Sequence, residues 1–497
     1  MPAQRVTVIG AGIGGLTAAI ELAARGCSVT VLERAAQPGG KMREVAVGTV
    51  RLDAGPTVLT LRGIFDAIFA AAGASLDTAV RLRPLDVLAR HAWDAGGRLD
   101  LFADRARSAE AIAAFAGPAE GRRYLEFCTQ AKRVFETLDA PFIRADRPSL
   151  LGLAGAFGPR RLGQLVQINP FESMWRALGR HFHDPRLQQL FGRYATYVGS
   201  SPFLAPATLM LVAHVEQAGV WQVEGGMHRL AAAMAKLATS RGAEIRYGAD
   251  VLEITLARRA VTGVRLASGE QLPADAVIFN GDCAALATGR LGPAVTAAVP
   301  APATRSLSAV TWLIEAECSG FPLHHHNVFF SRDYEAEFAD LFRHRRLPKA
   351  PTVYVCAQDR GLGDGPILGR ERLFCLVNAP ATGDTRPLSD RDIEACTADA
   401  FALLERCGLR MSRTPERTRM VTPMDFERLF PATGGALYGQ ASHGWKASFE
   451  RPGVRTRIAG LYLAGGSVHP GAGVPMAALS GRMAAAALMA DRPSTVP

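Results

Sequence analysis

The sequence predicts an α/β protein, with α+β content overall, that is divided into more than one domain. Near each end of the chain, a short apolar run typical of a β-strand is followed at once by a glycine-rich turn and a helix-like segment. A helical stretch punctuated by prolines and a stretch with several strand candidates lie between these two units. At 497 residues the chain is about three times the length of a typical domain of about 150 residues, so we expect two or three domains.

The N-terminal unit is typical of a strand, a helix and a second strand. Residues 5–9 are rich in β-branched side chains, residues 16–25 are Ala-rich and helical in character, and residues 28–32 form the second strand candidate. This pattern predicts a βαβ unit, in which the two strands lie parallel in one sheet.

The turn between the first strand and the helix has the spacing GxGxxG, formed by Gly10, Gly12 and Gly15, and Glu33 follows 18 residues beyond Gly15. Glycine lets the backbone approach a pyrophosphate, and the helix N-terminus offers unpaired N–H groups with partial positive charge. Glu33 can accept hydrogen bonds from both ribose hydroxyls, and an acid at this position disfavours the 2′-phosphate of NADP. The pattern therefore predicts a dinucleotide site.

A second glycine motif distinguishes flavin from nicotinamide. The segment RAAQPGGKMR follows Glu33 directly and contains the doublet Gly39 and Gly40 before Lys41. It resembles the glycine doublet of FAD enzymes in the glutathione reductase and amine oxidase superfamily, an extension that a nicotinamide dehydrogenase does not need. The resemblance implies a Rossmann-type FAD-binding domain.

The C-terminal unit consists of a strand candidate at 460–464, a glycine-rich turn at 465–474 and a helix from Pro475 to Ala490. N–H groups at such a helix start can stabilise charge on the pyrimidine end of a flavin. The whole string GLYLAGGSVHPGAGVPMAALSGRMAAAALM resembles the signature of the bacterial carotenoid (phytoene) desaturase family. Residues 53–57, 219–230 and 274–282 agree with the same family.

Within this family, residues 195–230 and 426–445 look most like the hydroxyneurosporene and methoxyneurosporene dehydrogenases of purple phototrophic bacteria. The resemblance implies an FAD-dependent oxidoreductase acting on CH–CH groups. Its reaction would introduce a C3–C4 double bond into 1-hydroxy or 1-methoxy acyclic carotenoids such as 1-hydroxyneurosporene. Phytoene desaturase is the nearest alternative, and a flavin amine oxidase, a carotenoid isomerase and a non-catalytic isoprenoid-binding protein of the same fold stay open.

The resemblance also assigns cofactor-binding residues by position. They are Gly10, Gly12, Ile13, Gly14 and Gly15 at the diphosphate, Glu33 and Arg34 at the adenosine ribose, Gly40 and Lys41 along the cofactor, Gly55, Pro56 and Thr57 beside the isoalloxazine ring, Val251 at the adenine, and Gly465, Gly466, Val474, Pro475 and Met476 at the flavin end. No catalytic side chain is assigned, because a charge that delocalises into a polyene reduces the need for a strong acid. Neither a general base nor a partner for the C1 hydroxyl stands out in the sequence.

Three regions are expected from these motifs and from the pass along the chain. They are a discontinuous FAD-binding domain at 1–80, 221–300 and 452–491, a mixed-sheet substrate domain at 81–130 and 301–451, and a helical, membrane-facing lid at 131–220.

A substrate dissolved in lipid implies a cytoplasmic protein bound peripherally to the inner membrane, because no window reaches the 18 or more apolar residues of a spanning helix. Arg160 and Arg161, which follow the apolar residues 150–157, suit a lipid anchor or an ordinary solvated loop equally. The net charge of +10 suits an anionic surface or solubility alone, and the absence of an RNA-binding signature disfavours nucleic acid. Quinone or oxygen fits as electron acceptor, since no second nucleotide motif is present.

Histidines and cysteines give no metal motif. We expect His324, His325 and His326 to form a surface loop, because successive residues point in different directions and no carboxylate cluster adjoins them. His443 and His469 suit structural roles as well as substrate contact, and neither is assigned to catalysis. The eight cysteines lack a CxxC pair and are expected to be reduced core thiols.

Overall fold

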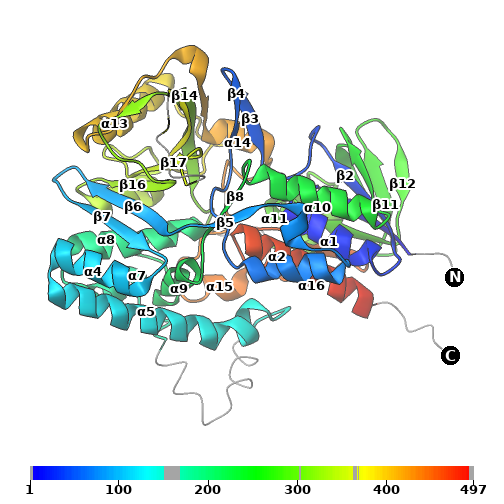
Figure 1. Cartoon of the computed structure of the whole chain (residues 1–497). Helices are drawn as coiled ribbons and strands as arrows, with labels where there is room; N and C mark the ends of the chain where they lie inside the picture. Colours follow the sequence, from blue (N-terminus) through cyan, green and yellow to red (C-terminus); the bar gives the residue numbers. More distant parts are fainter. Residues whose placement is uncertain (1–3, 150–167, 301–303, 362–366, 368, 492–497) are drawn as a thin grey trace, which may run out of the picture.

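The computed structural model describes residues 4–149, 168–300, 304–361, 367 and 369–491. Figure 1 shows two lobes, each built around its own sheet, with both chain ends beside the first of them. The first lobe combines three stretches of chain that lie far apart in the sequence, and the second lobe consists mainly of the residues between them.

The first lobe is built on a five-stranded parallel sheet. The strands, in sheet order, are β21 (Leu461–Leu463), β13 (Ala276–Phe279), β1 (Arg5–Ile9), β2 (Ser28–Glu33) and β9 (Glu244–Tyr247). In the register, Val8 of β1 lies between Val31 of β2 and Ile278 of β13. These apolar side chains are buried because helices cover the faces of a parallel sheet. The expected βαβ unit is confirmed.

Small residues allow the helices of this lobe to pack closely on the sheet and on one another. The helices are α1 (Ile13–Ala23), α2 (Arg62–Ala71), α10 (His228–Ser240) and α16 (Val474–Ala490). All residues of α1 are buried, and α16 and α10 both pack against it. A Cβ added at Gly481 of α16 would lie only 2.1 Å from the carbonyl oxygen of Gly14 in α1, so only glycine fits this crossing.

Short hairpins and helices complete the first lobe. After β9 the chain forms a separate three-stranded antiparallel sheet. Two-stranded ribbons lead toward the second lobe. These elements are β10 (Val251–Ala257), β11 (Ala260–Leu266), β12 (Gln271–Pro273), β3 (Glu44–Val47), β4 (Val50–Asp53), β5 (Leu82–Pro84), β8 (Trp221–Val223), α3 (Leu76–Ala79), α11 (Cys283–Ala287) and the 3₁₀ helix η4 (Pro293–Ala298).

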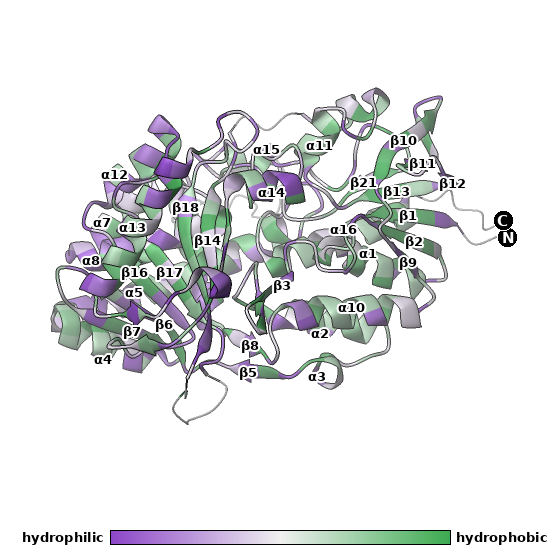
Figure 2. Cartoon of the chain, turned by 90° about the horizontal axis from the view of Figure 1, so that it is seen from above, coloured by the Kyte–Doolittle hydropathy of each residue, from purple (hydrophilic) through white to green (hydrophobic). Residues whose placement is uncertain are grey.

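The second lobe contains a seven-stranded mixed sheet. Its order is β20 (Thr418–Val421), β14 (Ser308–Ala316), β18 (Glu371–Ala379), β17 (Val353–Ala357), β16 (His326–Phe330), β6 (Val87–Trp93) and β7 (Arg98–Phe102). All nine residues of β14 and all five of β16 are buried, so both faces of the sheet are covered. Figure 2 shows the strands of both sheets largely in green, as such burial requires.

Helices lie below this sheet in Figure 1 and others cover its outer side. They are α4 (Arg105–Ala116), α5 (Pro118–Leu138), α7 (Met174–His181), α8 (Pro185–Gly192), α9 (Leu211–Gln217), α12 (Tyr334–Phe338), α13 (Asp390–Arg406), α14 (Pro423–Leu429) and α15 (Ala447–Glu450), with short turns η1 (Asp139–Ile143), η2 (Arg193–Val198), η3 (Ala207–Met210), η5 (Ala339–His344) and η6 (Pro415–Arg417). The strands β15 (Cys318–Ser319) and β19 (Arg410–Met411) pair as a separate two-stranded antiparallel ribbon. The described part of 131–220 is mainly helical, as expected.

Helix α5 crosses one of the expected boundaries. Helix α5 runs without a break across residues 130 and 131, where the sequence suggested a change from the substrate domain to the lid. The apolar residues Tyr124, Phe127, Ala131 and Val134 recur at helical spacing on its buried face, so no turn interrupts the helix there.

Two sequence expectations concern the whole chain. The eight cysteines are all free thiols, and six of them are buried. Across the described ranges, no helix is both long enough and apolar enough to cross a lipid bilayer.

Candidate functional site

A cavity of about 1430 Å³ lies between the two lobes and is the main candidate site. At one end it is lined by Ile9, Leu32 and Phe279, which lie at the carboxyl ends of three parallel strands. At the other end it is lined by strands of the seven-stranded sheet, among them β17 and β18. Ligands of doubly wound sheets bind at the carboxyl ends of their strands, so this cavity is where the sequence motifs place a dinucleotide.

The first glycine turn forms the floor of the cavity. Gly10 has a φ of +97°, which ends β1 and turns the chain into α1. A Cβ added at Gly15 would lie 2.2 Å from the carbonyl oxygen of Gly10, so Gly15 packs under the turn instead of lining the cavity. No side chain caps the first N–H groups of α1 and its first turn contains no acid, which leaves those donors for a ligand anion.

Asn280 holds this turn from the neighbouring strand end, and the sequence did not assign it a role. Its side-chain amide donates a hydrogen bond to the Gly10 carbonyl at 3.1 Å. The same amide nitrogen would lie 2.8 Å from a Cβ at Gly12, so the asparagine and the glycines fit one another. The only local signal was the turn that follows the strand at 274–279.

The adenosine end of the expected site is polar and ordered. The two carboxylate oxygens of Glu33 accept hydrogen bonds from the backbone N–H groups of Ala11 at 2.7 Å and Ala35 at 2.8 Å. Each oxygen keeps a second lone pair for a ribose hydroxyl. Arg34 donates to the carbonyl of Leu429 at 2.6 Å, and Val251, at the start of β10, is buried beside them.

The glycine doublet lies against the first turn, as a second close approach to the same ligand requires. Gly40 has a φ of +58°, and a Cβ there would lie 3.3 Å from the Cα of Gly12. Lys41 extends from the doublet toward the second lobe, where its Nζ donates to the carbonyl of Leu437 at 2.5 Å and lies 5.4 Å from the ring centre of Phe430. Burial lowers the pKa of Lys41.

Residues 53–57 connect the two lobes. The Asp53 carboxylate accepts hydrogen bonds from the backbone N–H groups at the start of α10, and burial raises its pKa. A Cβ at Gly55 would lie 1.8 Å from the carbonyl oxygen of Lys41, which leaves no room for any other residue. The Thr57 hydroxyl is 2.7 Å from the Tyr354 hydroxyl on β17.

The C-terminal turn presents a second helix start to the cavity. Gly465 has a φ of +111° and donates its N–H to the Ser480 hydroxyl at 2.8 Å. Helix α16 begins after Gly473 with no side-chain cap and no acid in its first turn. Two uncapped helix N-termini, of α1 and α16, therefore face one cavity and favour negative charge at two separate points.

The cavity brings the expected site residues together. Of the residues assigned by resemblance, those that line it are Gly10, Gly12, Ile13, Gly14, Glu33, Arg34, Gly40, Lys41, Gly55, Pro56, Thr57, Val251, Gly465, Gly466, Val474, Pro475 and Met476. Only Gly15 lies outside the lining, beneath the turn.

Arg451 is a cavity residue that the sequence did not reveal. Its guanidinium is buried and donates to the carbonyls of Tyr438 at 3.2 Å, Gly466 at 3.0 Å and Gln440 at 2.7 Å. It thereby fixes the C-terminal glycine turn to a loop of the second lobe. A single arginine before a proline is not a motif, so no pattern in the sequence could have indicated this role.

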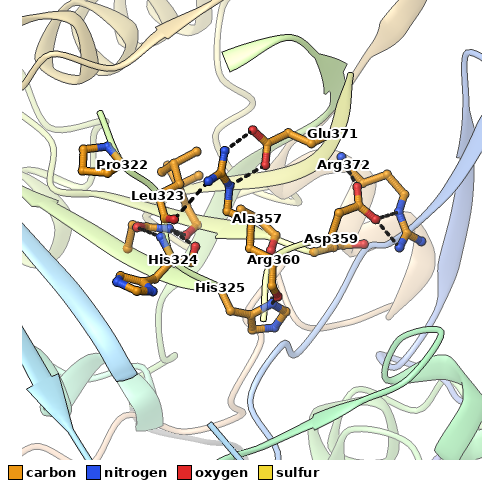
Figure 3. A network of polar contacts seen from close by, with 12 residues as sticks. Pro322, Leu323, His324, His325, Ala357, Asp359, Arg360, Glu371 and Arg372 are labelled. Carbon is orange, nitrogen blue, oxygen red and sulfur yellow. Dashed lines mark hydrogen bonds and ion pairs between the residues drawn. The ribbon is translucent and has the colours of Figure 1, made fainter. Parts of the chain in front are cut away.

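The expectation of a surface loop for the histidine triplet is wrong for His325 and His326, whereas His324 lies in a loop and is partly exposed. His325 and His326 are buried, because β16 is covered on both faces and begins at His326. Figure 3 shows the surrounding network, in which the backbone of Arg360 accepts from His325 while its guanidinium pairs with Glu371 at 2.8 Å. Burial lowers the pKa of His325 to about 4, so the ring is neutral near pH 7.

The imidazoles of His325 and His326 and the thiol of Cys356 form a compact buried group whose ligand atoms lie within 4.8 Å of one another. The Cys356 sulfur is 3.7 Å from His325 Nε2, so the thiol and the ring satisfy each other as donor and acceptor. No carboxylate of the described ranges joins the group. His443 and His469 also make backbone hydrogen bonds, to Ser201 and Phe142.

The geometry fits a flavin dinucleotide. Two close-approach glycine turns, two uncapped helix N-termini and an acid at the end of β2 line one cavity. The model of the flavin-containing amine oxidoreductase family matches residues 13–489. This chain belongs to that family.

Several relatives match this flavin-containing amine oxidoreductase over nearly its whole length. Hydroxyneurosporene desaturase of Rubrivivax gelatinosus is 58% identical, covering 99% of this chain and 94% of the relative. The enzymes of the same name from Cereibacter sphaeroides and Rhodobacter capsulatus are 47% and 45% identical. Each alignment covers 98% of this chain and 98% of the relative. The 4,4'-diapolycopene oxygenase of a Methylomonas species is 32% identical over 98% of each chain.

Solved structures show the same fold at low identity. Wild-type putrescine oxidase bound to putrescine has a TM-score of 0.59 and 16% identity, covering 98% of this chain and all of that one. An oxidoreductase from Methanosarcina mazei has a TM-score of 0.58 and 16% identity, covering 96% of this chain and 99% of that one. The resemblance to the carotenoid desaturases is confirmed, and FAD is the cofactor of this oxidoreductase.

Proposed function

We propose that this flavoprotein desaturates the C3–C4 bond of 1-hydroxy or 1-methoxy acyclic carotenoids such as 1-hydroxyneurosporene. The observation that supports this most strongly is the 58% identity, over 99% of this chain, to a protein named hydroxyneurosporene desaturase. The substrate end of the cavity agrees with an apolar chain as ligand, since burial of apolar surface contributes about 25 cal/mol per Å². Its apolar lining includes Leu138, Phe142, Leu209, Val212, Val215, Phe374 and Leu376.

Forming the double bond requires loss of one hydride and one proton from the two adjacent carbons. Bound FAD supplies the hydride acceptor. The residues of this chain bind the polyene along the apolar walls, orient its end group and exclude water from the reacting carbons. Spreading the developing positive charge over the polyene lowers the cost of that charge in an apolar cavity. The charge also makes the C–H of the remaining carbon acidic, so a weak base can take its proton. Quinone or oxygen then takes the electrons.

A peripheral position on the cytoplasmic face of the inner membrane would give the cavity access to a lipid-dissolved substrate. Phe171 is 77% exposed, contacts Trp445 edge-on at 5.4 Å between ring centres, and lines the cavity together with it. Leu204 is half exposed, and its carbonyl accepts the Gly444 N–H. A large apolar side chain exposed at a cavity is the kind of surface that inserts into lipid.

The apolar residues 150–157 and the adjacent Arg160 and Arg161, which the sequence also suggested for lipid contact, lie outside the described residues.

Replacing Phe171 by Ser should weaken binding to anionic vesicles about tenfold, because a phenylalanine side chain loses about 1.5–3 kcal/mol of apolar transfer. Co-sedimentation with phosphatidylglycerol-containing liposomes measures this. Met420→Ser is the matched control, since Met420 is 38% exposed on β20, away from the aromatic pair. Equal losses in the two variants would contradict membrane contact at Phe171.

The proposed reaction is tested by supplying FAD-loaded protein in liposomes with 1-hydroxyneurosporene and, separately, with phytoene. A product lighter by two hydrogens with a red-shifted absorption spectrum, formed only from the hydroxylated substrate, is expected. Turnover of phytoene instead would assign the protein to the early desaturases. Bound FAD without either product would favour an amine oxidase or an isoprenoid-binding protein, and a product of unchanged mass would indicate an isomerase.

A further inference from the structure

A cluster of polar side chains interrupts the apolar wall of the cavity where the two lobes meet. It comprises Arg193, Tyr197, Glu216, Tyr354 and Thr57, all of which line the cavity, and we call it the polar cluster. The Arg193 guanidinium lies 5.1 Å from the ring centre of Tyr197 and 5.3 Å from that of Tyr354. Both rings thus flank one cation, an arrangement that stabilises it in a site that excludes water.

Arg193 keeps hydrogen-bond donors that the protein does not use. The structure gives its guanidinium one hydrogen bond, from Nη1 to the Tyr197 hydroxyl at 3.1 Å, and no ion pair with any residue in the described ranges. Arg193 is partly buried, and it lines the cavity. Arg451, which also lines the cavity and is buried, differs because it donates to three carbonyls.

Neighbouring residues hold Arg193 in place. The Glu216 carboxylate accepts hydrogen bonds from the hydroxyls of Tyr197 at 2.8 Å and Tyr194 at 2.5 Å, so Tyr197 is fixed from behind. On the other side, the Tyr354 hydroxyl lies 2.7 Å from His326 Nδ1 and 2.7 Å from the Thr57 hydroxyl. A guanidinium held close to two fixed rings is pre-organised, which increases its discrimination between ligands.

We propose that Arg193 recognises the oxygen at C1 of the substrate by donating a hydrogen bond to it. This inference rests on the proposed function. The chemistry requires a polar partner, because an oxygen that loses its water inside an apolar cavity without a hydrogen bond disfavours binding. The C1 oxygen would also accept a hydrogen bond from the unused N–H donors of Arg193, which an oxygen-free chain would leave unsatisfied.

The position of the cluster agrees with the position of the reacting bond. C1 is separated from C3 by two bonds, so the group that binds the C1 oxygen must lie within a few ångströms of the carbons that react. Thr57 belongs to the segment that the family resemblance places beside the isoalloxazine ring. Its hydroxyl contacts Tyr354, and the Tyr354 ring contacts Arg193. The cluster is therefore at the flavin side of the substrate region.

The direction of the hydrogen bond has a consequence for substrate range. Arginine has five N–H donors and no acceptor. A hydroxyl and a methyl ether both offer an oxygen lone pair, so Arg193 can bind either one. Neurosporene, which has no oxygen at C1, would leave the guanidinium desolvated and unpaired, and a site built to bind an OH rejects such an analogue.

Three substrates and two variants test this inference. With wild-type holoenzyme, we expect similar kcat/KM for 1-hydroxyneurosporene and its 1-methoxy ether, and a value about 10- to 100-fold lower for neurosporene. Arg193→Met, which keeps an unbranched side chain between the two rings, should lower kcat/KM about 10- to 100-fold for the two oxygenated substrates but leave neurosporene unchanged or improved. Arg193→Lys, which keeps the charge and a donor, should restore part of the loss.

Binding is measured separately from turnover by titrating the holoenzyme with each carotenoid, the electron acceptor being withheld, and following the quenching of tryptophan fluorescence. Arg332→Met is the matched control, since Arg332 pairs with Asp94 on the surface and is 71% exposed. An equal loss for oxygenated and oxygen-free substrates in Arg193→Met would overturn the inference. If Arg193→Met fails to bind FAD, the comparison between Arg193→Lys and wild type on the three substrates decides. Absence of any turnover of 1-hydroxyneurosporene by the wild type would instead contradict the proposed function.

Discussion

The Gly15→Ala variant should be purified without FAD and should unfold more easily than the wild type. A Cβ at this position would lie 2.2 Å from the carbonyl oxygen of Gly10, and both groups belong to the backbone, so no side-chain rotation relieves the contact. The turn must move away from β1, which displaces the N–H groups at the start of α1. We expect a loss of about 2–4 kcal/mol in the free energy of unfolding. Flavin absorbance per protein and urea denaturation measure the two effects.

Gly63→Ala is the control for this substitution. Gly63 lies in the first turn of α2, and a Cβ there meets nothing within 4 Å. Because alanine favours helix over glycine by about 1 kcal/mol, this variant should bind FAD normally and be equally or slightly more stable. A Gly15→Ala protein that retained full flavin would show that the turn does not hold the diphosphate.

The second large effect concerns pH and the buried Glu337 of α12. Its carboxylate accepts hydrogen bonds from the hydroxyls of Thr352 at 2.7 Å and Ser331 at 3.4 Å, but burial outweighs them and raises its pKa from 4.5 to about 7. The folded state therefore binds a proton that the unfolded state has released, and stability is lost as the pH rises from about 4.5 through 7. Above pH 7 the fold carries a buried charge.

Glu337→Gln should remove this dependence, because glutamine has the same shape without the charge. At pH 5 the variant and the wild type should unfold at similar temperatures, and at pH 8 the variant should be more stable by about 3 kcal/mol. Thermal unfolding at a series of pH values gives the comparison. Glu335→Gln, an exposed change on the same helix, should show no such divergence. A constant difference across the pH series would rule out titration of Glu337 as the cause.

The sequence revealed the parts of the site that depend on a local backbone conformation. Gly10, Gly39 and Gly40 adopt positive φ, and the turn residues stand directly after a strand and before a helix, so spacing along the chain reflects their place in the fold. Five strands of the first lobe and its main helices follow from the same periodicity. The family resemblance added site residues such as Val251, which no local sequence pattern indicates.

The parts that the sequence missed are assembled from distant segments. Arg193, Glu216 and Tyr354 come from η2, α9 and β17, and no spacing links them. The prediction for the histidine triplet failed for a different reason. A strand buried on both faces lacks the alternation of apolar and polar residues that is typical of a half-buried strand, so polar residues at its start resemble a loop. Hydrogen bonds from the side chains of His326 and Asn327 to β17 replace the water that a loop would supply.

The strand order of the first lobe also determines when this protein can acquire its cofactor. β21 completes the sheet beside β13, and α16 supplies the second helix start, yet both follow the whole second lobe in the chain. On a ribosome that adds about 5–20 residues per second, the N-terminal βαβ unit waits on the order of a minute for these partners. Its apolar face is exposed during that time, so FAD capture must be a late, post-translational event and the nascent chain is a natural client for chaperones.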